Sequence, residues 1–266
     1  MSLLPELNRI SRQYGFLQKK KLSQSFLVDE RVLRREAGYL SPKGKTVLEI
    51  GPGFGFLTRE LALAGAKRIV AVEKDSRLMP ILEAELSGLG NVELVNADFL
   101  ETGVEADLVA SNVPYSVSSP VLFKLAEMRF ERAVLCLQRE FVSRMLARPG
   151  EKEYSRLSLA SQAALGIEFL ERVPRSAFHP PPNVDSAIIR VSPTGGTLSG
   201  GEQRLALNLF QHRKKTVRAA MSDSAEALGI SKSAARLAAE KSGLAKARVF
   251  SLSRENVSLI ASLLGS

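Results

Sequence analysis

Three glycines in the segment GPGFG, Gly51, Gly53 and Gly55, follow an apolar run and precede a pattern typical of a helix. At the junction of a strand and a helix, glycines let the backbone turn tightly and come close to a bound ligand. Dinucleotide-binding dehydrogenases carry a further glycine where Phe56 stands here, so the sequence disfavours a nicotinamide-dependent enzyme. Glu49, two positions before the first glycine, adds a carboxylate that we expect to belong to the same ligand site.

Further acidic residues follow the next two apolar runs at a spacing that suits a nucleoside. Glu73 lies 22 residues after Gly51, where a carboxylate can accept hydrogen bonds from both ribose hydroxyls. Asp98 can accept a hydrogen bond from an adenine amino group, while Phe99 packs against the ring. S-adenosyl-L-methionine fits these residues better than a dinucleotide, because the loop around Glu49 offers no basic residue to a pyrophosphate. The sequence therefore predicts a site for S-adenosylmethionine.

The segment Asn112, Val113, Pro114 and Tyr115 is of the type found at the active sites of amino-group methyltransferases. An exocyclic amine is a poor nucleophile because its lone pair is delocalised into the ring. The side-chain oxygen of Asn112 and a backbone carbonyl near Pro114 can accept its two N–H hydrogens and so direct the lone pair at the methyl donor. Tyr115 offers an aromatic face to the base. An asparagine before a proline turn is common without such chemistry, and the accompanying nucleoside residues favour the catalytic interpretation.

Alternating strands and helices are expected to hold these residues. Short apolar runs separated by helical patterns are typical of βαβ units with a mainly parallel sheet. The carboxyl ends of parallel strands share one edge of the sheet, which would place the nucleoside residues and Asn112 together. The expected strands are residues 46–50, 69–73, 92–95, 107–111 and 132–137, and the expected helices are 57–64 and 77–86.

The pattern changes in the second half of the chain. Residues 155–165 are expected to form a helix, and 167–173 and 187–191 to form late strands at an antiparallel edge of the sheet. Residues 192–203, rich in Gly, Ser and Thr, are expected to be a linker. Beyond it we expect only helices, over residues 205–221, 225–228, 232–241 and 255–264.

We therefore predict an α/β, Rossmann-like, S-adenosylmethionine-dependent methyltransferase domain over residues 1–195 and a small all-helical domain over 196–266. The net charge of +9 is concentrated at the two ends: residues 1–35 carry 8 basic and 3 acidic side chains, and residues 202–266 carry 11 and 5. Basic ends around a near-neutral middle favour contact with a polyanion, although such runs are also common on solvated surfaces. The densest clusters, Lys19, Lys20 and Lys21, and Arg213, Lys214 and Lys215 with Arg218, are the expected RNA-binding residues.

Several classes of protein are disfavoured by what the sequence contains. Its one cysteine, Cys136, allows no internal disulfide and no thiolate metal cluster. Two histidines, His179 and His212, are too few for a conventional histidine-rich metal site, and we expect no metal. The apolar runs are shorter than a membrane span, and the first residues lack the apolar core of a signal peptide. We therefore expect a cytoplasmic protein that does not enter a membrane.

Several longer motifs resemble those of the KsgA-type small-subunit ribosomal RNA adenine N6,N6-dimethyltransferases, and the resemblance covers nearly the whole chain. In chain order the motifs read LSQSFL (22–27), VLEIGPGFGFLT, VEKD, NADFL, NVPY, YSRLS (154–158), FHPPPNVDS (178–186), FQHRKKT (210–216) and LSREN. The segment FHPPPNVDS is the most specific of them. Ser23 and Ser25 stand where the family usually has Gly and Asn, and Val113 replaces the commoner Leu or Ile.

The resemblance implies a Rossmann-like domain with a small helical domain, and dimethylation of two adjacent adenosines at N6 in a hairpin loop near the 3′ end of small-subunit ribosomal RNA. It implies that Gln24, Ser25 and Leu27 contact the methionine end of the cofactor and that Gly51 cradles it. Glu73 would hold the ribose, Asp98 the adenine and Asn112 the target amine. It further implies that Phe178 stacks on the flipped target base opposite Tyr115, although a phenylalanine before HPPP can also simply pack a turn.

Two other functions remain open at this point. One is a large-subunit ribosomal RNA adenine methyltransferase of the macrolide-resistance type, which the segments FHPPPNVDS and FQHRKKT disfavour. The other is a ribosome-assembly factor in which methylation is secondary or lost; Glu73, Asp98, Asn112 and Tyr115 are all present, which disfavours lost catalysis. We expect the partner to be small-subunit ribosomal RNA within an immature subunit, and the protein to act as a monomer.

Overall fold

The apolar runs of the first half form the parallel part of a seven-stranded sheet in the computed structural model, which describes residues 1–17 and 25–265. The strand order is β4-β3-β2-β5-β6-β9-β7. The first five are parallel: β2 (Thr46–Ile50), β3 (Arg68–Glu73), β4 (Val92–Asn96), β5 (Leu108–Asn112) and β6 (Arg132–Gln138). β9 (Ser186–Pro193) pairs antiparallel with β6 and is followed in the order by β7 (Leu165–Val173), so the predicted antiparallel edge is confirmed.

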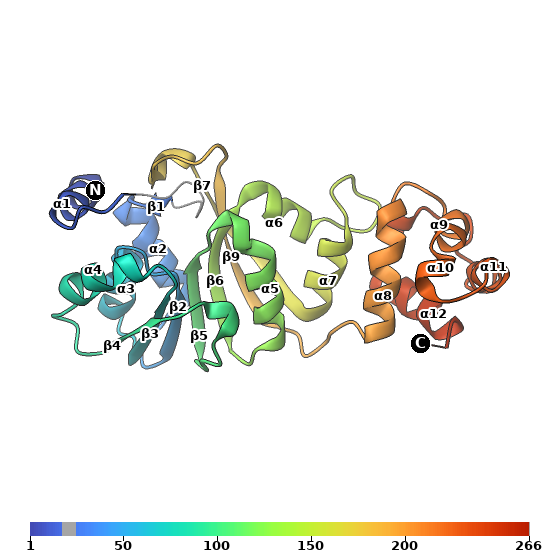
Figure 1. Ribbon diagram of the computed structural model, residues 1–266, viewed down its shortest axis with the longest axis horizontal. Helices are drawn as coiled ribbons and strands as arrows, with labels where there is room; N and C mark the ends of the chain where they lie inside the picture. Colours follow the sequence, from blue (N-terminus) through green and yellow to red (C-terminus); the bar gives the residue numbers. More distant parts are fainter. Residues whose placement is uncertain (18–24, 266) are drawn as a thin grey trace. The chain divides into compact units, whose positions relative to one another are not determined.

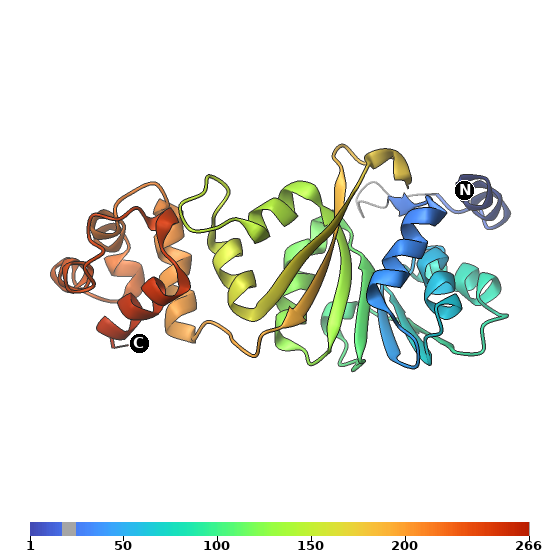
Figure 2. The same ribbon diagram turned by 180° about the vertical axis from the view of Figure 1, so that it is seen from behind.

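Helices lie on both faces of the sheet, some before its first strand and others between its strands (Figures 1 and 2). They are α1 (Leu4–Gln13), α2 (Glu30–Leu40), α3 (Phe56–Leu63), α4 (Met79–Glu85), α5 (Ser118–Glu127) and the start of α6 (Arg139–Leu146). The chain runs from β2 through β3 to β4 in one direction along the sheet, and from β5 to β6 in the other. Right-handed crossovers in opposite directions place their helices on opposite faces, and the loops leaving β2 and β5 therefore diverge.

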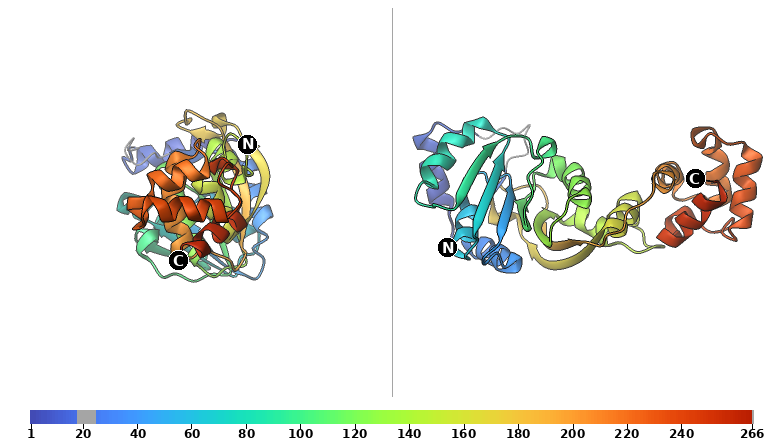
Figure 3. Two further views of the ribbon diagram at one scale, coloured as in Figure 1. Left: turned by 90° about the vertical axis from the view of Figure 1, so that its right-hand side faces the viewer. Right: turned by 90° about the horizontal axis from the view of Figure 1, so that it is seen from below.

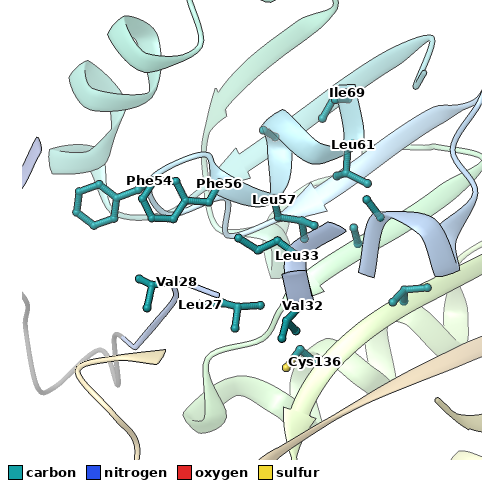
Figure 4. Close-up of a cluster of buried hydrophobic side chains, with 14 of the residues drawn as sticks. Leu27, Val28, Val32, Leu33, Phe54, Phe56, Leu57, Leu61, Ile69 and Cys136 are labelled. Atoms are coloured by element: carbon teal, nitrogen blue, oxygen red, sulfur yellow. The ribbon is translucent and has the colours of Figure 1, made fainter. Parts of the chain in front are cut away.

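The core of this unit gathers side chains from α2, α3 and the glycine-rich loop. Figure 4 shows Leu33 of α2 in one cluster with Phe56 and Leu57 of α3 and with Phe54 of the loop. The buried positions of α2 include Leu33, Glu36, Ala37 and Leu40, whose spacing forms one helical face. A short two-stranded sheet pairs β1 (Phe26–Leu27) with β8 (Phe178–His179), so these two segments lie side by side although they are far apart in sequence.

The chain divides into two compact units at places that differ from the single boundary expected near residue 195. Residues Met1–Val142 and Gly166–Pro193 form the sheet unit, and residues Ser143–Leu165 and Thr194–Ser266 form the helical unit. The 143–165 segment belongs with the C-terminal helices because Tyr154 is buried among them. Its hydroxyl donates to the Leu252 carbonyl at 2.9 Å, and its ring centroid lies 5.8 Å from that of Phe210.

The helical unit packs its helices against one another (Figure 3). They are α7 (Arg156–Ala164), α8 (Gly200–Leu209), α9 (Val217–Asp223), α10 (Ala225–Leu228), α11 (Lys232–Lys241) and α12 (Arg254–Leu263). Among the described residues, no helix is long and apolar enough to cross a membrane.

Two expectations for this unit were wrong. The linker expected over residues 192–203 ends early, because Ser199 and Glu202 form a capping box that starts α8: the Glu202 backbone N–H donates to Ser199 Oγ at 3.2 Å, and the Ser199 N–H donates to Glu202 Oε2 at 2.6 Å. The single helix expected over 205–221 is two, because the Thr216 hydroxyl accepts from the Ala219 N–H and begins α9 anew.

Candidate functional site

A cavity of about 620 Å³ opens in the sheet unit beside the carboxyl ends of its parallel strands. The strand register explains the place: Glu73 and Asn96, the last residues of β3 and β4, lie opposite each other, and Asn112, the last residue of β5, lies opposite Cys136 near the end of β6. The divergence of the loops after β2 and β5 leaves space between them. The predicted residues that line the cavity are Ser25, Leu27, Glu49, Gly51, Gly53, Glu73, Asp98, Phe99, Asn112, Pro114, Tyr115 and Phe178. Gln24 lies outside the described residues.

The glycine loop at the end of β2 adopts a backbone that only glycine tolerates well. Gly51, Gly53 and Gly55 have φ angles of +70°, +61° and +78°. A Cβ on Gly51 would meet nothing within 4 Å, so this glycine borders open cavity, whereas a Cβ on Gly53 would lie 3.0 Å from the Phe26 ring. Gly55 does not line the cavity: it caps α3 and packs against Leu86, 2.9 Å from where a Cβ would stand. Its role is to form the loop rather than to touch a ligand.

Glu73 joins the end of β3 to this glycine loop. Its Oε2 accepts from the Gly53 N–H at 3.2 Å and its Oε1 from the Asp75 N–H at 2.8 Å. Burial raises the pKa of the Glu73 carboxyl, and these backbone donors oppose that effect. The carboxylate is thus fixed in orientation at the cavity wall, where two ribose hydroxyls could donate to it.

Asp98 carries a partner that the sequence analysis missed. Its Oδ1 accepts from the Leu100 N–H at 3.0 Å, and its Oδ2 lies 2.5 Å from Lys74 Nζ. The hydrogen bond from Lys74 lowers the pKa of Asp98. Lys74 is largely exposed and also lines the cavity, so the Asp98 carboxylate borders the cavity with a paired cation beside it. Phe99 is buried next to Asp98, and Lys124 Nζ lies 4.7 Å from its ring centroid.

Asn112 ends β5 with its two amide atoms in different surroundings. Nδ2 donates to Glu36 Oε2 at 3.3 Å, whereas Oδ1 is buried and has no hydrogen-bond partner among the described residues. A buried acceptor without a partner is costly and therefore rare, and one that lines a cavity is suited to a donor on a ligand. The Pro114 carbonyl accepts from the Val117 N–H at 3.0 Å and keeps a second lone pair.

The two aromatic residues predicted to hold the target base line the same cavity. Tyr115 is fixed by a 2.6 Å hydrogen bond between its hydroxyl and Ser186 Oγ, another contact that the sequence analysis missed. Phe178 is 6% exposed and pairs with Leu27 across the β1–β8 ladder, so it packs in the core while lining the cavity. The Ser25 hydroxyl donates to the Pro180 carbonyl, which joins the segments around LSQSFL and FHPPP a second time.

Two carboxyls are buried at the cavity: Glu49 lines it, whereas Glu36 does not line it and contacts Asn112. Glu49 and Glu36 are 1% and 0% exposed, and burial raises the pKa of each to about 8. Each has one oxygen without a partner among the described residues, Oε2 of Glu49 and Oε1 of Glu36. Glu36 was not among the predicted site residues. Its position could have indicated it, because it is a charged residue on the apolar face of the helix over residues 30–40.

The basic residues of the FQHRKKT region lie in the helical unit and differ in their contacts. Arg213 is half-buried and donates to the Lys152 carbonyl, and its guanidinium lies 5.9 Å from the Phe250 ring centroid, which makes it partly structural. Lys215 pairs with Asp223 at 2.7 Å and Arg218 with Glu240 at 3.3 Å, whereas Lys214 is exposed. Lys19, Lys20 and Lys21 lie outside the described residues.

The raised pKa of Glu36 predicts how stability depends on pH. In the unfolded chain Glu36 loses its proton near its ordinary pKa of 4.5, whereas in the folded protein it keeps the proton up to about pH 8. The free energy of unfolding therefore falls between these values, by at most about 1.4 kcal/mol per pH unit for this group. Compared with the wild type, Glu36→Gln should become relatively more stable as pH rises from 5 to 8. Urea unfolding at several pH values measures this, and a difference that does not change with pH would contradict it.

Comparisons with known proteins identify the family of the chain. A family model described as ribosomal RNA adenine dimethylase matches residues 15–249. A probable ribosomal RNA small subunit methyltransferase A from Thermococcus gammatolerans is 42% identical over 254 residues, which cover 92% of this chain and 88% of that protein. A dimethyladenosine transferase from Plasmodium falciparum has a crystal structure with a TM-score of 0.77 and 28% identity, covering 88% of this chain and 95% of that one. The 23S rRNA methyltransferase ErmE reaches 0.66 and 29%, over 91% and 100%.

These similarities extend over both units of the chain and confirm the predicted fold class and the resemblance found in the motifs. The protein is a methyltransferase, and it belongs to the ribosomal RNA adenine dimethylase family.

Proposed function

We propose that the protein uses S-adenosyl-L-methionine to dimethylate N6 of two adjacent adenosines in a hairpin loop near the 3′ end of small-subunit ribosomal RNA. The observation that carries the proposal is Asn112 Oδ1, a buried acceptor at the wall of the cavity with no partner among the described residues. An amine N–H placed there would satisfy it. We further propose that the substrate is an immature small subunit in the cytoplasm and that the enzyme acts as a monomer.

The residues at the ends of β2, β3 and β4 would hold the cofactor. Glu73 accepts from the ribose hydroxyls, Asp98 accepts from the adenine amino group, and Phe99 packs beside the ring. Glu49, Gly51 and Gly53 border the space between ribose and methionine, and Gln24, Ser25 and Leu27 contact the methionine end. When bound, S-adenosylmethionine supplies a methyl group made electrophilic by its positive sulfur.

The residues at the end of β5 would hold the target amine. Asn112 Oδ1 accepts one N–H and a backbone carbonyl near Pro114 accepts the other, which turns the nitrogen lone pair out of conjugation with the ring. Tyr115 and Phe178 offer their rings to the base. The neutral amine needs no general base before attack, and the proton leaves afterwards. The contribution of the protein is therefore positioning.

A methylation assay on small subunits that lack the modification tests this function, with mapping of the labelled adenosines. We expect label on two adjacent adenosines near the 3′ end of the small-subunit RNA. Label on large-subunit RNA instead would favour the macrolide-resistance type. Binding of immature subunits with no methyl transfer would favour an assembly factor and contradict the proposal.

Asn112→Ala should keep the cofactor affinity of the wild type but slow single-turnover methyl transfer by on the order of 100-fold or more, because the lost interaction acts on the attacking amine. Asn91→Ala is the matched control: that amide donates to the Ala66 carbonyl at 2.8 Å, at the opposite edge of the sheet, and its loss should leave the rate unchanged. A rate for Asn112→Ala within a few-fold of the wild type would rule out the assigned role.

Glu73→Ala and Asp98→Ala should each weaken cofactor binding by about 1.5–3 kcal/mol, the scale of hydrogen bonds to charged groups. Isothermal calorimetry with S-adenosylmethionine measures the loss. Glu93→Ala serves as the control, because Glu93 is an exposed carboxylate on β4 that pairs with Arg68 away from the cavity. If all three variants bind equally well, the cofactor is not held as proposed.

The basic cluster of the helical unit should bind RNA phosphates without reading sequence. A Lys214→Ala/Lys215→Ala variant spares the partly structural Arg213, and should weaken subunit binding and flatten its salt dependence by roughly 0.7 for each lost phosphate contact. Lys43→Ala/Lys67→Ala removes the same charge from exposed positions at the amino edge of the sheet and should bind as the wild type does. If the affinity for the subunit depends on salt concentration equally in the wild type and both variants, Lys214 and Lys215 are solvent-exposed and do not contact RNA.

A further inference from the structure

Glu36 is a fully buried carboxyl on an otherwise apolar helix face, and it meets Asn112. It is 0% exposed, and the neighbouring buried positions of α2 are Leu33, Ala37 and Leu40. A hydrophobic residue would suit this face and would avoid the cost of burying a carboxyl. The one hydrogen bond that the described residues give to its side chain comes from Asn112 Nδ2, at 3.3 Å. The position is therefore poorly explained by packing alone.

The contact decides which way the Asn112 amide faces. A primary amide has a donor side and an acceptor side, and a half turn about its last side-chain bond exchanges them. Glu36 offers an acceptor to the donor side, which leaves Oδ1 to face the cavity. The turned amide would bring Nδ2–H towards the N–H groups of a target amine, where donor meets donor. Nothing else among the described residues bonds to either atom of the amide and could fix its orientation.

We propose that Glu36 is a positioning residue for methyl transfer: its carboxyl holds the Asn112 amide in the orientation that presents Oδ1 to the target amine. This inference rests on the proposed function. Glu36 does not line the cavity and acts only through Asn112. The acceptor is available in both protonation states, because the neutral acid still has a carbonyl oxygen with free lone pairs.

The other groups around Glu36 do not replace it. Glu49 and Glu171 are carboxyls that raise its pKa through their charge, and Cys136 is a buried thiol on β6. Among the described residues none of these groups forms a hydrogen bond with Asn112: Glu171 pairs with Arg35 at 2.8 Å, and the buried Oε2 of Glu49 has no partner. With Glu36 removed, the amide would be free to turn.

Two substitutions at Glu36 separate this role from packing. Glu36→Met keeps the length of the side chain and removes the acceptor, and it should slow single-turnover methyl transfer at least 10-fold without changing the affinity for S-adenosylmethionine. Glu36→Gln keeps an acceptor oxygen and should recover most of the rate. Leu40→Met changes the same helix face away from Asn112 and should be as fast as the wild type. If Glu36→Met is also as fast, or if Glu36→Gln is as slow as Glu36→Met, the inference is wrong.

A double-mutant cycle with Asn112→Ala provides the sharper test. If Glu36 acts through Asn112, adding Glu36→Met to Asn112→Ala should change the rate by less than about 2-fold, whereas its effect on thermal unfolding should persist. A 10-fold loss in both backgrounds would show that Glu36 acts by supporting the fold. The wild type in the same assay separates the two proposals: if it methylates no adenosine of the small-subunit RNA, the proposed function fails, and this inference with it.

Discussion

The parallel pairing of β2, β3 and β5 is the constraint on which the site depends. Parallel strands in register end at one edge, so the Glu49 loop, Glu73 and Asn112 come together although they are spread over more than sixty residues of sequence. The chain leaves β2 towards β3 and leaves β5 towards β6, in opposite directions along the sheet. The space between the diverging loops becomes the cavity, and Gly51 borders it, since a Cβ there would meet nothing within 4 Å.

Burial of polar groups at this edge lowers the stability of the fold. A buried oxygen without a partner in the described part of the chain is present in each of Glu36, Glu49 and Asn112. Burial also raises the pKa of the Glu36 and Glu49 carboxyls to about 8, well above the ordinary value for glutamate. Such groups would be replaced by apolar ones if packing were all that mattered. Glu49 and Asn112 line the cavity, where a ligand can complete their hydrogen bonds, whereas Glu36 does not line it and meets the amide of Asn112 instead. The site is therefore prepared for its ligand before the ligand arrives.

Much of the sheet could be predicted from the sequence, because each buried strand is a short apolar run between glycine, charge or turn residues. β2, for example, matches residues 46–50 as expected. The place of the residues expected to hold a nucleoside could also be predicted, because Glu73 ends β3, Asp98 closely follows β4, and both line the cavity. The helical unit was harder. Thr216 starts a new helix inside a continuous helical pattern, and Ser199 starts one inside a glycine-rich segment. In both cases the hydrogen bond of one side-chain hydroxyl sets the start of the helix, which the composition of the segment does not indicate. Contacts between distant residues, such as Glu36 with Asn112 and Tyr115 with Ser186, leave no local pattern and require the fold.

The central claim is that one cavity holds the cofactor and presents the target amine to Asn112 Oδ1. A crystal structure with both S-adenosylhomocysteine and adenosine bound tests it most directly. We expect the cofactor ribose at Glu73, and the N6 amine of the second adenosine within hydrogen-bond distance of Asn112 Oδ1, with Nδ2 still bonded to Glu36. An adenosine bound away from Asn112, or an amide turned so that Nδ2 faces the cavity, would contradict it.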